Sequence, residues 1–207
     1  PTDITVSGDP HPSGGPFTAT DGEGGMVWMK DRDSGMNYVL MDTERGIDKI
    51  LHTDGTWSDT AAAANDQANT FRSFNNNGFT IGNTGYVNTS GNDFTSWTWR
   101  KQKGFFDIVK YTGTGSATTI PHNLGSVPGM IIIKRYGAPE GWRVYHRGMS
   151  STPAASGLYL NTNDPLTSNS TYFNNTLPTS SVFSVGTDDT VNLLNNGYIA
   201  YLFAGGE

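Results

Sequence analysis

The chain has 207 residues, of which only 15% are charged, and its formal net charge at pH 7 is −6. A negative balance disfavours nucleic acid as a partner, because binding phosphates requires a basic surface. The sequence contains no cysteine, which excludes disulfide bonds and thiolate metal sites.

The composition is typical of an all-β protein. Aromatic residues are numerous, with 10 Phe, 9 Tyr and 5 Trp, and there are 26 Gly. Aromatic and β-branched side chains pack well on strands, whereas Gly and Asn form the turns between them. No stretch approaches the roughly 18 apolar residues of a membrane span. We therefore expect short strands and long loops in a β-sandwich or jelly-roll-like architecture without a membrane segment.

An internal repeat appears when the sequence is shifted by 104 residues. Residues 25–30 then fall on 129–134, and residues 79–82 fall on 183–186. The other matches are Tyr38 with Trp142, Leu40 with Val144, residues 87–88 with 191–192, and Phe94, Trp97 and Trp99 with Tyr198, Tyr201 and Phe203. A constant offset predicts two tandem β repeats, residues 1–103 and 104–207.

The start of the chain fits this repeat less well. Residues 4–8 occupy a place similar to that of 111–115, but residues 1–23 as a whole are atypical, and we expect an attachment or assembly segment there. Further on, residues 26–30, 94–99, 105–111 and 130–134 are expected strands, and 59–71 is the one helical candidate. Turns are expected where Gly or Asn can supply positive φ, at Asp54-Gly55, Asn77-Gly78, Gly91-Asn92 and Asn196-Gly197.

Metal and cofactor sites are not expected. Asp31, Asp33 and Ser34 alternate as in calcium loops, but the third acidic position and the closing Glu are missing, so a polar turn is the better interpretation and a weak calcium site the alternative. Asp188-Asp189 is interpreted in the same way. None of the histidines has a second histidine at metal-ligand spacing, and His122 and His146 are expected to have structural roles; the four are His11, His52, His122 and His146.

Catalysis has no visible sequence signature, and we expect a non-enzymatic protein without catalytic residues. A Gly-x-Ser-x-Gly elbow, a phosphate-binding loop and a dinucleotide fingerprint are all absent from the sequence. Paired glycosidase carboxylates can lie far apart in a sequence, so a glycan-degrading enzyme stays open as an alternative.

Tryptophans are candidates for either packing or sugar binding. Trp97 and Trp99 recur as aromatic residues in the second repeat, which favours a shared packing role in the core. Trp57 lies between Thr56 and Ser58 in a segment that the repeat does not match. It is therefore the candidate carbohydrate contact.

Several runs resemble an uncharacterised tandem β-domain family of bacteriophage tail-fibre and virion structural proteins, found mainly in phages of marine bacteria and cyanobacteria. The runs lie at residues 106–115, 120–125, 128–134, 142–146, 178–186 and 198–204, with further matches at 42–46 and 73–82. The resemblance extends over nearly the whole chain from about Gly24.

The resemblance implies a virion structural protein on the surface of an extracellular phage particle, in a tail, a fibre or a capsid appendage. It implies other virion proteins as partners, and a homo-oligomer, with a trimer among the expected forms. The alternative is a receptor-recognition module that binds glycans of the host surface. No catalytic or binding residues follow from the resemblance.

Overall fold

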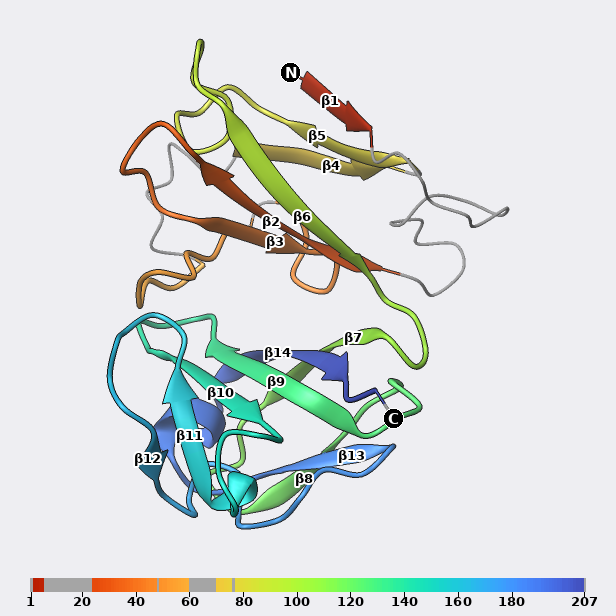
Figure 1. Ribbon diagram of the computed structural model, residues 1–207, viewed down its shortest axis with the longest axis vertical. Helices are drawn as coiled ribbons and strands as arrows, with labels where there is room; N and C mark the ends of the chain where they lie inside the picture. The colour runs from red at the N-terminus through yellow and green to blue at the C-terminus, as the bar shows by residue number, and fades with distance from the viewer. Residues whose placement is uncertain (1, 6–23, 48, 60–69, 76, 207) are drawn as a thin grey trace. The chain divides into compact units, whose positions relative to one another are not determined.

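A computed structural model describes residues 2–5, 24–47, 49–59, 70–75 and 77–206 (Figure 1). The chain is all-β, as its composition predicts, and it forms two compact units, residues 1–101 and 102–207. The described helical elements are the 3₁₀ turn η2 (Pro153–Ala155) and the four-residue helix α2 (Asp189–Asn192). Most of the helical candidate at 59–71 lies outside the described residues. No helix among those described is long and apolar enough to cross a membrane.

The first unit contains two three-stranded antiparallel sheets, with the strand orders β1-β5-β4 and β3-β2-β6. Their strands are β1 (Thr2–Thr5), β2 (Gly25–Asp31), β3 (Val39–Asp42), β4 (Phe71–Asn75), β5 (Gly78–Ile81) and β6 (Phe94–Arg100).

The second unit contains a six-stranded sheet, β12-β11-β10-β9-β14-β7, and a two-stranded sheet, β13-β8. Their strands are β7 (Phe106–Thr112), β8 (Thr118–Pro121), β9 (Pro128–Arg135), β10 (Trp142–His146), β11 (Ser156–Tyr159), β12 (Thr167–Ser168), β13 (Val182–Val185) and β14 (Gly197–Ala204).

The strand registers repeat at the same 104-residue offset as the sequence. In the first unit Trp28 lies opposite Trp97 and Leu40, and in the second Ile132 lies opposite Tyr201 and Val144. A one-residue slip would move every side chain to the other face of the sheet, so this shared register means that both units bury equivalent positions.

The start of the first unit aligns differently from our expectation. Strand β1 places Ile4 opposite Phe79, whereas β8 places Ile120 opposite Phe183. Because Phe79 and Phe183 are equivalent, β1 is the counterpart of β8, and the comparison of residues 4–8 with 111–115 is wrong. The connection to the next strand is longer in the first unit, from β1 to β2, than in the second, from β8 to β9, which explains why the constant offset fails there.

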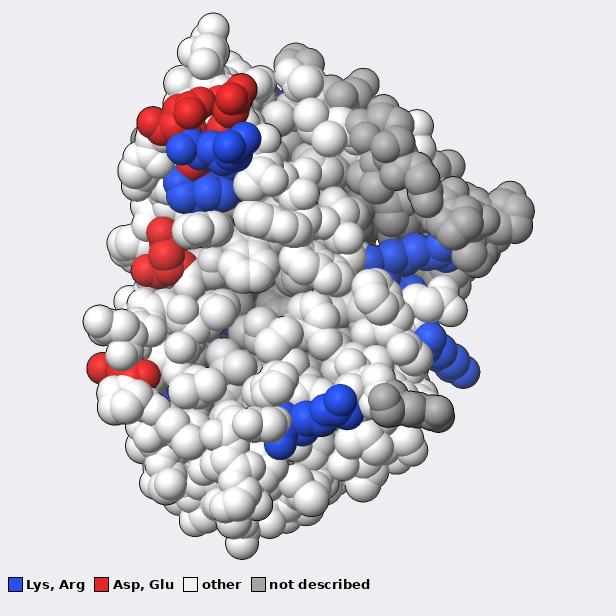
Figure 2. Space-filling model, in the orientation of Figure 1, with Lys and Arg blue, Asp and Glu red and all other residues white. Residues whose placement is uncertain are grey.

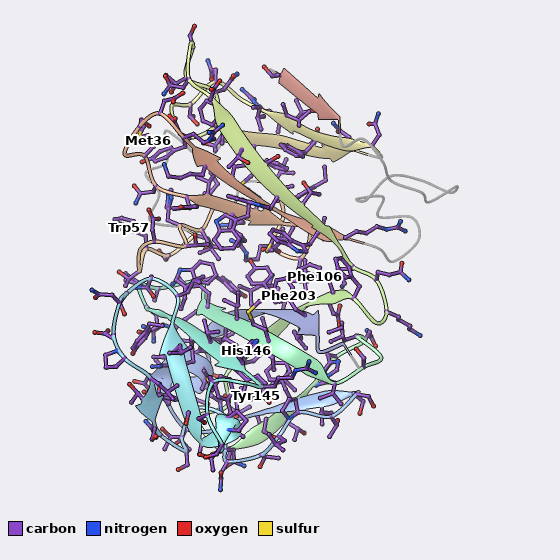
Figure 3. The ribbon with its side chains drawn as sticks, viewed as in Figure 1. Met36, Trp57, Phe106, Tyr145, His146 and Phe203 are labelled. Atoms are coloured by element: carbon purple, nitrogen blue, oxygen red, sulfur yellow. The ribbon has the colours of Figure 1, made fainter. Side chains whose placement is uncertain are left out.

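Each unit is a β-sandwich whose core lies between its two sheets. Alternate residues of a strand point to opposite faces, so Tyr145 enters the core of the second unit while its neighbour His146 is exposed (Figure 3). The first core contains Val27, Met29, Val39, Met41, Ile50, Phe71, Phe79, Ile81 and Val87. The second contains Ile120, Leu124, Ile131, Ile133, Tyr145, Tyr172, Phe173, Phe183, Val185, Val191, Tyr198, Ala200 and Leu202.

Two of the expected turns contain a residue with positive φ, but in only one of them is it the residue that the sequence predicts. Gly91 has φ +86°, as expected, but at the other turn the left-handed residue is Asn195, with φ +60°, rather than Gly197. Gly55 does not have positive φ; its small size is required by a ring that packs over it, as described below.

A buried arginine closes one side of the second core. The Arg143 guanidinium lies between the rings of Tyr159 and Tyr172, at 3.9 and 3.6 Å from their centroids, and its Nε donates to Thr190 Oγ1 at 3.3 Å. Gly157 leaves room for this stack, because a Cβ there would lie 2.8 Å from the Tyr172 ring and 2.9 Å from the Arg143 side chain.

We expect Gly157→Ala to lower the free energy of unfolding by about 1–3 kcal/mol, because the added methyl group must displace the stacked rings. Gly137→Ala is the matched control, since a Cβ at Gly137 meets nothing within 4 Å. Urea unfolding followed by tryptophan and tyrosine fluorescence measures both. Equal unfolding midpoints for the two variants would contradict this account of the stack.

Candidate functional site

Trp57 projects from the loop that follows β3 and is 45% exposed (Figure 3). Its six-membered ring lies directly over Gly55, and a Cβ at that position would overlap the ring atoms Cζ3 and Cε3. Only a glycine allows this close approach of ring and backbone. The local sequence Gly-Thr-Trp thus holds the indole against the loop, with part of its surface open to solvent.

A second aromatic layer supports the indole. The His52 ring meets the Trp57 ring edge to face at a centroid distance of 5.5 Å, and Tyr86 lies 5.3 Å from His52 on a separate loop. His52 itself is only 7% exposed, and its Nδ1 lies 2.9 Å from the Tyr38 carbonyl oxygen. A carbonyl accepts, so Nδ1 carries the proton. We call Trp57, His52 and Tyr86 the Trp57 platform.

Burial lowers the pKa of His52 below its ordinary value of 6.5, against the opposing effects of its hydrogen bond to Tyr38 and the nearby charge of Asp54. The imidazole is therefore neutral at pH 7. A neutral ring supports the indole without placing a cation beside it, so the platform is an aromatic surface rather than an anion site.

Polar groups lie near the platform, Asp54 on the loop of Trp57 and Asn37 on the loop between β2 and β3. The Asp54 carboxylate, through Oδ2, accepts from Asn37 Nδ2 at 3.2 Å and from the Tyr38 backbone N–H at 3.4 Å. Few charged side chains are visible on the face drawn in Figure 2, in keeping with a sequence in which they make up 15%. An exposed indole with an amide and a carboxylate nearby fits a neutral hydroxylated ligand: the ring stacks on its C–H face while the polar groups bond to its hydroxyls.

Asp31 and Asp33 serve a turn rather than a metal ion. Asp31 accepts from the Asp33 N–H at 2.9 Å, from Ser34 Oγ at 2.7 Å and from Asn92 Nδ2 at 2.8 Å. The hydrogen bond from Ser34 is the main cause that lowers the pKa of Asp31. The Lys30 ammonium donates to the carbonyls of Asp31 and Ser34, so a cation of the chain itself already occupies the oxygen-rich turn. Among the described residues, no group of three or more His, Asp or Glu could hold a metal.

The other polar positions singled out in the sequence also lie in turns. His122 Nδ1 accepts from the Leu124 N–H at 3.3 Å and its Nε2 lies 3.2 Å from the Thr179 carbonyl, which ties the turn after β8 to the segment that precedes β13. His146 accepts from the Gly148 N–H at 3.2 Å. Asp188 caps α2 by accepting from the Thr190 N–H at 2.9 Å. His11 lies outside the described residues.

The sequence predicts a core position for Trp97, but its side chain is 44% exposed. Its ring belongs to an aromatic cluster on the face of the β3-β2-β6 sheet opposite to the core, where the Trp28 ring lies 6.0 Å from Trp97, 6.2 Å from Trp99 and 6.1 Å from Tyr38. The equivalent face of the second unit carries the ring pair Trp142–Tyr201, at 6.4 Å. It also carries the pair Phe106–Phe203, at 4.9 Å, which is labelled in Figure 3. The aromatic positions that the two units share therefore lie on the sheet face opposite to the core, and not in the core itself.

The sequence did not identify the residues that support Trp57. His52 and Gly55 lie within five residues of it, so their nearness was open to inference. Tyr86 lies 29 residues further along the chain, and no periodicity connects it with the loop.

Comparison with known proteins gives one match, to a family described as a domain of unknown function, DUF7483, over residues 4–207. The chain belongs to the DUF7483 family. Because one match spans both compact units, the DUF7483 domain comprises the pair of units together. No curated protein and no solved structure matches the chain.

Lowering the pH should destabilise the fold through His52 and His122, since burial lowers the pKa of both below 6.5. Well above pH 6.5 both rings are neutral in the folded and the unfolded chain, and their contribution to stability is fully present. As the pH falls below 6.5 the unfolded chain takes up these protons first, so the free energy of unfolding falls.

Urea unfolding between pH 7.5 and 5.5 measures this loss, with the double variant His52→Gln/His122→Gln as the comparison. The variant should have the flatter profile. An identical slope for both proteins would show that these histidines do not cause the pH dependence.

Proposed function

We propose that this chain is a non-catalytic structural protein of a bacteriophage particle, displayed on its surface in a tail, a fibre or a capsid appendage. The observation that carries the proposal is that the runs resembling virion domains coincide with strands of the second unit. Residues 106–115 include β7, 128–134 include most of β9, and 198–204 include most of β14. The resemblance thus lies in the residues that build the sheet.

The β-sandwich suits this role on physical grounds. Each unit has its own core, and its turns are fixed by short-range hydrogen bonds such as those of Asp31, His122 and Asp188. Because the chain has no cysteine, short-range hydrogen bonds of this kind hold its turns without disulfides, and such a module can be repeated along an appendage. Fold alone does not give function, and the virion assignment depends on the sequence runs.

Virion appendages are usually closed symmetric assemblies, so we expect the purified chain to form a homo-oligomer, with a trimer among the expected forms. Size-exclusion chromatography with light scattering measures its mass. A monodisperse monomer at high concentration would contradict an assembling role, and electron microscopy of labelled particles that never places the chain on a virion would contradict the assignment itself.

A second candidate function, recognition of host-surface glycans, is favoured by the Trp57 platform. A half-exposed indole held in place by Gly55 and His52 is arranged before a ligand arrives, which reduces the entropic cost of binding. The neutral His52 and the Asn37–Asp54 pair suit a sugar better than an ionic ligand.

On a glycan array prepared from host-surface polysaccharides, Trp57→Ala should reduce binding by about tenfold or more, the effect of removing an aromatic residue at the centre of a contact. Gly55→Ala should also reduce binding, because it moves the indole without removing it. Gly35→Ala is the control, since a Cβ at Gly35 meets nothing within 4 Å. Wild-type protein that binds no host sugar would rule out this function while leaving the virion role untouched.

A further inference from the structure

The segment that pairs with β3 in the first unit corresponds to β11, which pairs with β10 in the second. Leu40 of β3 pairs with Leu51, and its counterpart Val144 of β10 pairs with Leu158. Leu158 lies 107 positions after Leu51. In this region the two units are therefore related by an offset of 107 residues instead of 104.

A hydrogen bond repeats at the new offset. Asp54 Oδ2 accepts from the Tyr38 backbone N–H at 3.4 Å. Asn161 Oδ1 accepts from the backbone N–H of Trp142, the counterpart of Tyr38, at 2.8 Å. Asn161 lies 107 positions after Asp54, so strand pairing and hydrogen bonding agree on which residues are equivalent.

Tyr159 is the counterpart of His52 by the same offset, and it lies where the first unit has the Trp57 platform. Its ring packs closely on the backbone of Gly141, since a Cβ there would lie 2.6 Å from the ring. The ring of Trp57 lies over Gly55 in a similar way. The side chain of Tyr159 is partly exposed. The second unit thus presents an aromatic ring to solvent at the place equivalent to the Trp57 platform.

The two equivalent places differ in charge. The Arg143 guanidinium lies behind the Tyr159 ring, 3.9 Å from its centroid, whereas the counterpart of Arg143 in the first unit is Val39. Val39 is a fully buried residue of the first core, so the fold does not require a cation at this position. The ring that supports the platform in the first unit, His52, is neutral at pH 7. Packing alone therefore does not explain the arginine.

Arg143 forms no direct ion pair with a described carboxylate. Its Nη1 and Nη2 are buried and have no hydrogen-bond partner among the described residues. Its Nε donates to Thr190, which donates in turn to Asp188, so a carboxylate is linked to it only through this hydroxyl. The neighbouring Glu140 is paired with Arg135 at 3.3 Å. A buried charge without a direct partner is costly, and it favours an anion at the surface nearby.

Asn161 adds a hydrogen-bond donor beside the ring. A Cβ at Gly141 would lie 3.6 Å from Asn161 Oδ1 as well as close to the Tyr159 ring, so the two side chains lie next to each other. Oδ1 accepts from the Trp142 N–H, and no described residue accepts from Nδ2. The equivalent Asp54 of the first unit has acceptor oxygens alone. The second unit therefore combines an aromatic ring, an amide donor and a positive charge.

We propose that Tyr159, Asn161 and Arg143 form a second sugar-binding site, the Tyr159 site, which takes a sugar that carries a carboxylate, such as a uronic acid. The C–H face of the sugar stacks on Tyr159 and its carboxylate accepts from Asn161 Nδ2, while the Arg143 charge acts from behind the ring. This inference rests on the glycan recognition proposed above and deepens it, because the first unit then binds a neutral sugar and the second an acidic one.

The test compares methyl β-D-glucuronide with methyl β-D-glucoside, which differ by a carboxylate in place of a hydroxymethyl group. Each sugar is titrated into the full chain, and NMR follows the side-chain amide of Asn161, the Nε–H of Arg143 and the indole N–H of Trp57. The glucuronide should shift the Asn161 and Arg143 signals and bind there about tenfold or more tightly than the glucoside, as expected for unit charges about 7 Å apart near a protein surface. The glucoside should shift the Trp57 signal.

Three variants separate charge from structure. Arg143→Met keeps an apolar side chain between the two tyrosines and should abolish the preference for the glucuronide. Arg147→Met is the control, because it removes an exposed arginine of the same unit and should leave the preference unchanged. Asn161→Asp keeps an acceptor for the Trp142 N–H, as Asp54 does in the first unit, and should weaken glucuronide binding about tenfold or more even if Arg143→Met fails to fold.

The outcomes distinguish this inference from the function on which it rests. Glucoside binding at Trp57 without glucuronide binding at Asn161 would overturn the Tyr159 site and leave the Trp57 platform as a sugar site. A preference for the glucuronide that persists in both Arg143→Met and Asn161→Asp would also overturn it. Absence of binding of either sugar would overturn glycan recognition in both units.

Discussion

The antiparallel pairing of β2 with β6, repeated as β9 with β14, is the constraint on which both units depend. It sets which side chains face the core and which face outward, and β3, β10 and β7 take their registers from it. The pairing brings together residues about 70 positions apart in sequence, and closing such a loop is entropically costly. Burial of the apolar core faces of these strands, Val27 and Met29 in one unit and Ile131 and Ile133 in the other, offsets that cost.

The two units differ at one edge of the sheet that contains their last strand. The second unit completes its sheet with β7 and fills its core with Tyr111, whereas the described part of the first unit has an open sheet edge and a cavity at the equivalent place. Proteins generally cover or blunt exposed edge strands because an open edge invites pairing with other chains.

The strands of the repeat could be predicted because their signals are local. Gly-Met followed by β-branched or aromatic residues marks β2 and β9, and aromatic residues two positions apart, Trp97 and Trp99 or Tyr201 and Phe203, mark β6 and β14. The relation of β1 to β8 could not be predicted, because it depends on cross-strand pairing rather than on a constant spacing. Exposure of Trp97 was missed for a related reason: sequence identifies an aromatic position on a strand, but which of the two faces is covered is a property of the assembled sandwich.

At the candidate site, the sequence identified Trp57 from its loop context but not what holds it. The requirement for Gly55 comes from a ring that lies over the backbone, and the contact of His52 with Tyr86 comes from two loops that meet only in the fold. The most direct test of the shared framework is a set of cross-strand backbone NOEs measured by NMR. The account predicts contacts for Val27 with Thr98 and for Ile131 with Leu202, one register in both units. A register that differs between the units by even one residue would contradict it.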